Sequence, residues 1–442
     1  MSLRVLAVLL AAVLLAALSP ARAPFQAQAQ ALPVPPGWQL ERAILLSRHG
    51  VRAPLESNEV LDRTAASPWP AWPVASGRMT PRGADLLRLM GTYYRVLYGG
   101  RGLVQTDDCP PVGTVAAWAD VEERTRESAA AVLSGMYPRC GDLILRMKAS
   151  TADIDPLFHA QRSASCPIDP AAVRGAILAR IGGDFSSVTR EYAPQLARMG
   201  EVLCPPGVAD GGRCAPAQAL STLEVAPDGR PKIVGPIGTA STAAESFLME
   251  AADGWPAAQV AWGRLRGDGD LVELLGLHRL AFDLTQKTPI VARANGSSLL
   301  AQITDALVDG RFFPGLPPNP SPVRFGLLMG HDTNIANVQS LLKLGWQIPG
   351  FQANEASPGG ALAFELYREG GSGLHYVRVA YVAQTLPQLR EATPLGLASP
   401  PGIVAVELPE CAAQARDKAC PLSRFVEIAK AAVDLGCVTL RP

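Results

Sequence analysis

The chain alternates short apolar runs with longer amphipathic stretches, and two of the apolar runs stop abruptly at polar residues. Residues 40–47 and 323–329 are almost continuously apolar, which is typical of strands buried on both faces of a sheet. After Pro81 the apolar residues recur at helical spacing, and Thr80 is placed to cap this helix. Strands and helices that alternate in this way predict an α/β fold.

The same patterns predict the other elements and a division of the chain into regions. We expect further strands at 115–118, 362–367 and 376–381, and further helices at 125–136, 171–198, 239–252 and 335–344. The middle of the chain also contains a stretch rich in Gly, Pro and Cys at 204–236. We therefore predict a signal peptide at 1–31, a first part of an α/β domain at 32–149, a helical insertion at 150–245, and a second part of the α/β domain at 246–442.

The N-terminus has the order of segments found in a secretory signal peptide. Arg4 is followed by an apolar run at 5–18 and then by small residues, with cleavage expected after Ala29 or Ala31. The run is shorter than the roughly 20 residues that span a bilayer, although a membrane anchor is the alternative interpretation. We expect a periplasmic or secreted protein with no membrane association after cleavage.

The cysteine count and the charge balance indicate what kind of exported protein this is. The eight cysteines form no C-x-x-C pair, and an even number behind a signal peptide predicts four disulfides, with buried free thiols as the alternative. Cys204–Cys214 and Cys411–Cys420 would close short loops. Lys+Arg and Asp+Glu are both 40, so the basic excess typical of nucleic-acid binders is missing. We expect a monomer without a nucleic-acid partner.

The first candidate site follows the strand predicted at 40–47. Arg48 and Arg52 flank His49, and a guanidinium group offers a planar fork of donors that matches phosphate oxygens. A neutral His49 held between these arginines could attack phosphorus. A salt-bridged surface turn with a solvated histidine would produce the same residues.

The second candidate site follows the strand predicted at 323–329. His331 could donate to phosphate and Asp332 could supply a proton, whereas the alternative is that Asp332 or Thr333 merely caps the next helix. Ligands of open α/β sheets bind at the carboxyl ends of the strands, so we expect the clusters at His49 and Asp332 to converge. The free N–H groups of the helix start would favour an anion there.

A third group of charged residues lies at 120–126. Arg124 follows a predicted strand and precedes a predicted helix, so it could reach the same edge of the sheet. A charged helix start is the alternative. We expect Glu122 and Glu123 to orient arginines rather than bind a metal.

Together these strings resemble the histidine acid phosphatase family. The two-part signature is R-H-G-x-R-x-P at 48–54 with G-H-D-T-N at 330–334. D-V-E-E-R-T-R at 120–126 and W-G-R-L at 262–265 resemble the bacterial periplasmic branch of 4-phytases and glucose-1-phosphatases. The similarity covers nearly all of the mature chain. It implies a phosphoglycerate-mutase-like fold, with a central mixed sheet flanked by helices and a smaller, mainly helical inserted domain.

The resemblance also implies roles for individual residues. His49 matches the nucleophile and Asp332 the proton donor, while the matches to phosphate ligands are Arg48, Arg52, Arg124 and His331. No cofactor or metal is implied, since the guanidinium groups supply the electrostatic stabilisation. The implied disulfides are Cys109–Cys140, Cys166–Cys437, Cys204–Cys214 and Cys411–Cys420.

The chain departs from this pattern near the substrate pocket. Asn295 stands where some phytases of this branch carry an extra arginine, which weakens the expected fit to phytate, while Arg293 is retained. Glu245 matches an acidic residue near the pocket, and an exposed helix carboxylate is the alternative. We regard Glu245 and Arg293 as candidate pocket residues.

These observations predict an exported acid phosphomonoesterase that acts through a phosphohistidine. Its substrate is phytate, a sugar phosphate or a generic monoester. We also expect the positive pocket to favour an ionised His49, and an acidic pH optimum. Three alternatives are a phosphoglycerate mutase relative, a non-catalytic periplasmic phosphate- or sugar-phosphate-binding protein, and a scaffold that has lost activity.

Overall fold

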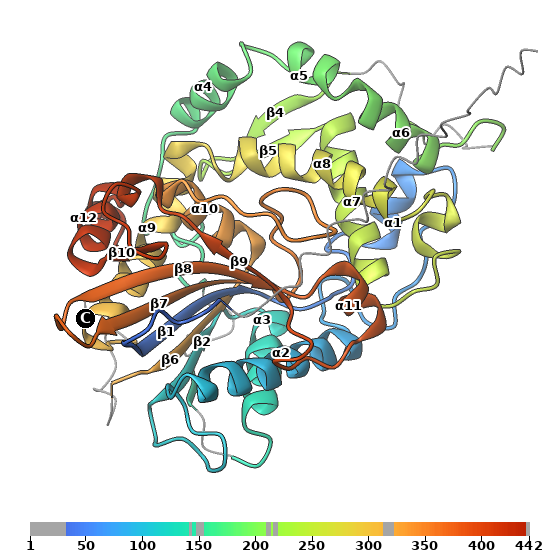
Figure 1. The fold of residues 1–442 in the computed structure, drawn as a ribbon. Helices are drawn as coiled ribbons and strands as arrows, with labels where there is room; N and C mark the ends of the chain where they lie inside the picture. The colour runs from blue at the N-terminus through green and yellow to red at the C-terminus, as the bar shows by residue number, and fades with distance from the viewer. Residues whose placement is uncertain are drawn as a thin grey trace, which may run out of the picture.

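The computed structural model describes residues 32–140, 144–146, 154–208, 214, 220–312 and 322–438. The predicted signal peptide at 1–31 lies outside these residues. Figure 1 shows a sheet with helices on both faces, and a further group of helices with a small hairpin beside it. Among the described residues, no helix combines the length and the apolar character that a membrane span needs.

The sheet is mixed and has eight strands, as the predicted fold class requires. Their order is β10-β8-β7-β1-β6-β2-β3, and β9 also pairs with β8. The strands are β1 (Trp38–Arg48), β2 (Val115–Ala119), β3 (Ile144–Arg146), β6 (Phe325–Gly330), β7 (Ala361–Glu369), β8 (His375–Ala383), β9 (Gly402–Val406) and β10 (Ala419–Pro421). Because β1, β6 and β2 run parallel, with Arg48 opposite Gly330 and Ala119 opposite Met329, their carboxyl ends lie at the same edge.

Helices cover both faces of this sheet (Figure 1). On one side lie α2 (Pro81–Gly100) and α3 (Glu123–Met136), and on the other lie α9 (Pro289–Asp309), α10 (Asp332–Leu342) and α12 (Leu422–Ala432). Leu45 packs in the core on the α2 side, while Ile44 and Leu46 pack in the core on the α9 side. Two buried faces explain why residues 43–46 of β1 are all apolar.

The N-terminal boundary of α2 follows the predicted capping pattern. Thr80 accepts a hydrogen bond from the backbone N–H of Gly83, and Pro81 occupies the first turn. A Cβ atom on Gly83 would lie 2.4 Å from the carbonyl oxygen of Val51, so glycine lets α2 pack directly against the loop that follows β1.

The remaining elements lie over the carboxyl edge of the sheet and around its rim. They are α4 (Pro170–Arg180), α5 (Ser186–Glu191), α6 (Ala193–Leu203), β4 (Thr222–Val225), β5 (Pro231–Val234), α7 (Pro236–Ala252) and α8 (Asp268–Thr285) with the short helices α1 (Asn58–Leu61) and α11 (Leu386–Glu391). Single turns of 3-10 helix occur at η1 (Asp62–Thr64), η2 (Val260–Gly263), η3 (Pro409–Cys411) and η4 (Leu435–Cys437).

The prediction of one helix at 171–198 is wrong. Three helices occupy this region, because Gly182 and Gly183 adopt φ values of +79° and +106° that end α4. The stretch at 204–236 contains the β4–β5 hairpin, which the sequence pattern did not indicate. The limits of the helical insertion stay a prediction, although residue 245 falls inside α7.

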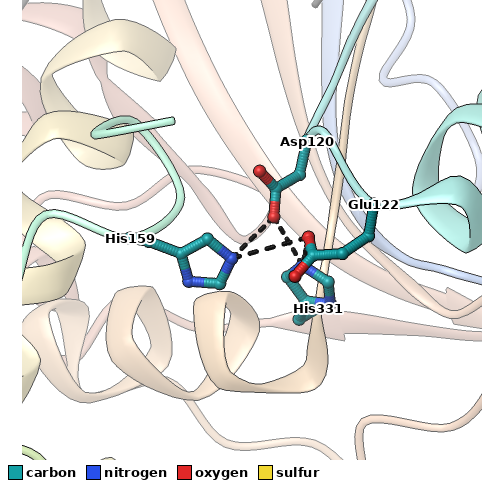
Figure 2. A group of neighbouring side chains, drawn as sticks. All are labelled: Asp120, Glu122, His159 and His331. Atoms are coloured by element: carbon teal, nitrogen blue, oxygen red, sulfur yellow. Dashed lines mark hydrogen bonds and ion pairs between the residues drawn. The ribbon is translucent and has the colours of Figure 1, made fainter. Parts of the chain in front are cut away.

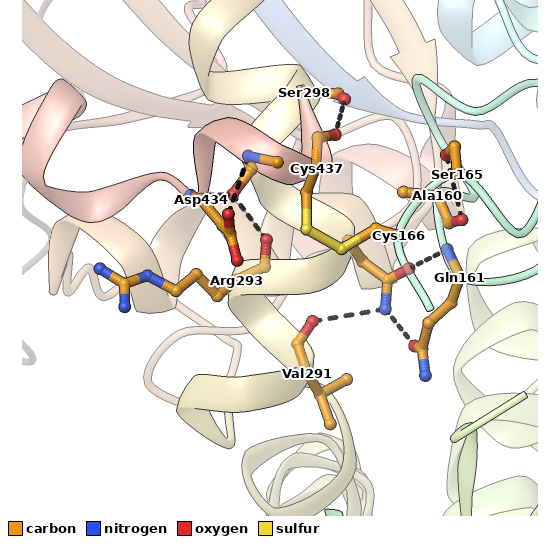
Figure 3. Close-up of a disulfide and its surroundings, with 12 residues drawn as sticks. Ala160, Gln161, Ser165, Cys166, Val291, Arg293, Ser298, Asp434 and Cys437 are labelled. Carbon is orange, nitrogen blue, oxygen red and sulfur yellow. Dashed lines mark hydrogen bonds between the residues drawn. A yellow bond between two sulfur atoms is a disulfide. The ribbon is translucent and has the colours of Figure 1, made fainter. Parts of the chain in front are cut away.

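The four disulfides are the pairs that the family resemblance implied. They are Cys109–Cys140, Cys166–Cys437, Cys204–Cys214 and Cys411–Cys420. Cys166 and Cys437 are 271 residues apart in the sequence, and Figure 3 shows their bond beside α9. The hydroxyl of Ser298 on α9 donates to the carbonyl of Cys437 at 2.8 Å, so the C-terminal turn is fixed to this helix in two ways.

Candidate active site

The two polar clusters that follow β1 and β6 meet at the carboxyl edge of the sheet. They line a pocket of about 660 Å³ together with Arg124, Glu245 and residues of the β4–β5 hairpin. His49 and Asp332 both line this pocket, and the rings of His49 and His331 lie 5.5 Å apart between centroids. The predicted convergence of two segments almost three hundred residues apart is therefore present.

His49 is buried at the bottom of the pocket, and its ring is held by a backbone contact. Nδ1 lies 2.8 Å from the carbonyl oxygen of Gly50. A carbonyl oxygen can only accept, so Nδ1 carries the proton and the lone pair of a neutral ring is on Nε2. The backbone N–H of Gly50 donates to Ser128 Oγ at 2.9 Å, which fixes the loop.

The expectation of an ionised His49 is wrong. Burial lowers the pKa of His49 well below its usual value of 6.5, and the positive charges of Arg124, Arg48 and Arg52 lower this pKa further. Nearby guanidinium groups disfavour a second positive charge on the ring. The pocket therefore keeps His49 neutral and nucleophilic in mildly acidic solution.

Arg48 and Arg52 share a partly buried carboxylate from α7. Glu245 Oε1 lies 2.5 Å from an Nη of Arg48 and 2.8 Å from an Nη of Arg52. Burial alone would raise the pKa of Glu245, but Arg52 and Arg48 lower it well below its usual value. Glu245 is thus a pocket residue that orients both arginines, and not an exposed helix carboxylate.

Arg48 lies beneath the pocket, with no solvent exposure of its side chain. One Nη donates to the carbonyl of Ala356 at 2.7 Å, and the other also contacts Asp332 Oδ2 at 2.8 Å. The pKa of Arg48 is raised: burial acts to lower it, but the charges of Asp332 and Glu245 outweigh burial. Arg48 therefore holds the carboxyl group of Asp332 in place, and its expected role as a phosphate ligand stays a prediction.

Asp332 is the first residue of α10, which begins three residues earlier than predicted. The N-cap is His331, and its backbone N–H donates to Asn334 Oδ1 at 2.9 Å. Neither Asp332 nor Thr333 is the N-cap residue. Asp332 Oδ1 accepts from the N–H of Thr333 at 2.8 Å, and its carboxyl group lines the pocket at the positive end of the helix.

Arg124 reaches the pocket, as the position of its motif suggested. Its Nη lies 3.4 Å from His331 Nδ1 and 3.7 Å from Glu122 Oε1. The other glutamate of this motif, Glu123, lies 3.7 Å from Arg78 and accepts from the backbone N–H of Met79. Glu122 also faces two histidines, which the sequence did not indicate.

Asp120 and His159 are site residues that sequence reasoning missed (Figure 2). Asp120 follows β2 and lies 2.7 Å from Nε2 of His331, so it orients the ring from behind. Its position at the end of a predicted strand was the available signal. His159 lies outside every predicted element, and nothing in the local pattern marked it. The pocket rim further includes three basic residues that were not singled out: Arg162, Arg230 and Lys232.

The two residues singled out on α9 have different surroundings. Asn295 lines the pocket and donates to Gln161 Oε1 at 2.5 Å. Arg293 instead donates to the carbonyls of Ala431 and Ala432 at 3.0 and 3.1 Å, at the end of α12. The structure does not bring Arg293 to the pocket.

Comparison with known proteins agrees with this geometry. The family model of the histidine phosphatase superfamily (branch 2) matches residues 39–193 and 268–382. Phytase AppA of Escherichia coli (strain K12) is 35% identical over 91% of this chain and 94% of that protein. Glucose-1-phosphatase of Salmonella typhimurium is 29% identical over 90% of this chain and 93% of that protein.

Solved structures give the same result. Hafnia alvei phytase in complex with myo-inositol hexakis sulphate superimposes with a TM-score of 0.84 and 36% identity, covering 91% of this chain and 99% of that one. A catalytic phosphatase is supported over a non-catalytic binding protein. The chain belongs to branch 2 of the histidine phosphatase superfamily and is a histidine acid phosphatase.

Proposed function

We propose that this chain hydrolyses phosphate monoesters through a phosphohistidine formed on Nε2 of His49. The contact between Nδ1 of His49 and the Gly50 carbonyl carries the proposal, because it leaves Nε2 with its lone pair. The low pKa of His49 keeps that lone pair free of a proton. Positive groups around the ring would stabilise the charge on the transferred phosphoryl group.

In the first step, Arg52, Arg124 and His331 hold the nonbridging oxygens of the phosphate. Nε2 of His49 then attacks in line, so the P–N bond forms as the P–O bond to the leaving alcohol breaks. Asp332 begins protonated and gives its proton to the leaving oxygen. Arg48 and Glu245 act as positioning residues from beneath, through their contacts with Asp332 and Arg52.

In the second step, water attacks phosphorus from the side that the alcohol has left. Asp332 now accepts a proton from this water, the new P–O bond forms, and the P–N bond breaks to release inorganic phosphate. His49 returns to its neutral state. The residues so assigned need no metal for either step, because guanidinium groups face the phosphate.

The substrate class is a phosphate monoester with room for a bulky alcohol. The pocket volume of about 660 Å³ and the rim residues Arg162, Arg230 and Lys232 support an anionic substrate larger than phosphate. Phytate and glucose 1-phosphate are both candidates, since the relatives include a phytase and a glucose-1-phosphatase. Export is part of the proposal, supported by the signal-like N-terminus and by four disulfides, which persist in oxidising compartments.

Mutation of His49 tests the covalent step. We expect H49A to lower kcat/KM for p-nitrophenyl phosphate by on the order of 10³-fold or more. A radiolabelled ester, quenched in alkali to preserve a phosphohistidine, should label the wild type and leave H49A unlabelled. H375A is the matched control, because His375 pairs with Glu41 on the sheet at 3.1 Å. Label that persists in H49A would contradict the proposal.

A further inference from the structure

Four side chains from distant segments meet beside the phosphate pocket and are not all used by the reaction. Asp120 follows β2, Glu122 precedes α3, His159 lies in the turn after residue 154, and His331 precedes α10. Figure 2 shows the two imidazoles converging on the two carboxylates. One ligand atom from each residue lies within 4.8 Å of all the others.

Both imidazoles approach the same carboxylate oxygen. Nε2 of His159 and Nε2 of His331 each lie 2.7 Å from Asp120 Oδ2. The other oxygen, Oδ1, is fixed by the backbone N–H of Val121 at 2.8 Å. The buried Nε2 of His159 makes no hydrogen bond of acceptable direction to any described residue, although it is close to Asp120. Its nearest neighbour is the Asp120 carboxylate, at ion-pair distance, so this nitrogen points into the cluster.

Glu122 completes the set from the opposite side. Its Oε2 lies 3.2 Å from Nε2 of His331 and 3.7 Å from Nε2 of His159. Ligands of a tetrahedral zinc ion, each about 2.0–2.2 Å from the metal, are roughly 3.3–3.5 Å apart. The contacts of Glu122 already have this spacing, and the two contacts to Asp120 need to lengthen by roughly 0.6 Å.

We propose that Asp120, Glu122, His159 and His331 form a binding site for one divalent transition-metal ion of the zinc class. Two imidazole nitrogens and two carboxylate oxygens suit borderline metals and a four-coordinate geometry. Mg²⁺ and Ca²⁺ prefer six or more oxygen ligands, so the two imidazoles select against them.

The bound ion positions His331 and does not act on phosphorus. Coordination of Nε2 leaves the proton of a neutral His331 ring on Nδ1. Nδ1 lies 3.4 Å from an Nη of Arg124, and a guanidinium group only donates, so with the proton on Nδ1 the two nitrogens do not bond each other and both offer donors to an anion in the pocket. The ion also links the segment around His159 to β2 and α10. Metal binding is measured without substrate, so it can fail or succeed independently of the phosphohistidine mechanism.

Titration of tag-free, chelator-treated protein tests the proposal. With Zn²⁺ at about pH 7.5 in a buffer without phosphate, we expect one equivalent to bind by calorimetry and the melting temperature to rise. Co²⁺ should give the intense visible absorption of a tetrahedral site. H159N should weaken Zn²⁺ binding by at least about 10-fold and remove the Co²⁺ spectrum.

H375N is the control variant, since it removes a histidine that pairs with Glu41 away from the pocket. It should bind Zn²⁺ as the wild type does. If H159N does not fold, as judged by circular dichroism, E122Q removes a second ligand and carries the same test. A wild type that binds no stoichiometric Zn²⁺, or a folded ligand variant that binds it unchanged, would overturn the proposal.

Discussion

Two clusters in this protein each join two arginines to a shared glutamate, but the hydrogen-bond donors of one cluster are satisfied and those of the other are not. We call Arg48, Arg52, Arg124, Glu245 and Asp332 the pocket cluster, in which Glu245 contacts Arg48 and Arg52. Glu365 with Tyr367, Arg101 and Arg378 is the sheet cluster. In the sheet cluster, Glu365 accepts from Arg101 at 2.6 Å, from Arg378 at 2.9 Å and from the hydroxyl of Tyr367 at 2.6 Å. Arg101 and Arg378 also donate to the backbone carbonyls of Leu32 and Pro33, respectively. These guanidinium groups therefore bond to protein acceptors on both sides and are not directed at a ligand.

The pocket cluster leaves donors free. Among the described residues, Nε of Arg48, Arg52 and Arg124 has no hydrogen-bond partner. Burial lowers the pKa of Arg124, and the positive charge of Arg52 lowers it further. The pKa of Arg101 is instead raised, because the negative charge of Glu365 outweighs the effect of burial. A buried cation without full compensation is costly, so the pocket gains from an added anion. The comparison distinguishes arginines that hold the fold from arginines that bind a substrate.

The largest effect is expected for the carboxyl group of the pocket cluster. D332N cannot donate a proton, so we expect kcat to fall by about 10²–10⁴-fold on a sugar phosphate. The loss on p-nitrophenyl phosphate should be much smaller, because nitrophenolate leaves without protonation. Steady-state rates on both esters check this. Equal losses on the two substrates would contradict the assignment of Asp332 as the acid.

The sheet cluster should respond in stability and not in turnover. E365Q leaves Arg101 and Arg378 without their shared charge, and removing one partner of a buried pair typically costs about 3–5 kcal/mol. Urea unfolding measures this loss, while kcat per folded molecule should stay unchanged. E410Q, which breaks the exposed pair with Lys343, should leave the free energy of unfolding almost unchanged. A large fall in kcat for E365Q would contradict the assignment of the sheet cluster to stability alone.

The pH dependence of this penalty follows from the pKa of Glu365. Burial would raise that pKa, but Arg101 and Arg378 bring it below the usual value of 4.5. A lowered carboxyl pKa means that the stabilisation is complete above the unfolded value and is lost as pH falls through the folded value. The E365Q penalty should therefore be constant above about pH 5 and decrease only in more acidic solution.

A smaller effect is expected on the acid limb of the pH–rate profile. His49 must be neutral to attack, and burial followed by Arg124 lowers its pKa. R124Q removes one repelling charge, so the acid limb of kcat/KM should move up, toward 6.5, by at most about one pH unit. R126Q is the control, because Arg126 donates to the carbonyl of Val121 outside the pocket lining. An acid limb that moves down would contradict the cause given for the low pKa.

Local sequence patterns predicted the strand and the helix that support the site. They did not predict which side chains reach the pocket, because packing between elements determines that. The apolar run before Arg48 and the Thr80–Pro81 cap fixed β1 and α2, because these signals act within one turn or strand. The placement of Arg293 did not follow from its motif. Asn295 is two residues away on α9, and side chains at that spacing point to different sides of a helix.

The amino-acid sequence alone determined the alternation of strands and helices, the polar residues at the strand ends, and the four cysteine pairs implied by family resemblance. Tertiary structure decided which charges meet. Glu245 joins Arg48 and Arg52 across almost two hundred residues, and His159 joins Asp120 through no local pattern. Tertiary structure also determined the protonation state of His49, because a pKa depends on burial and on neighbouring charges that only folding brings together.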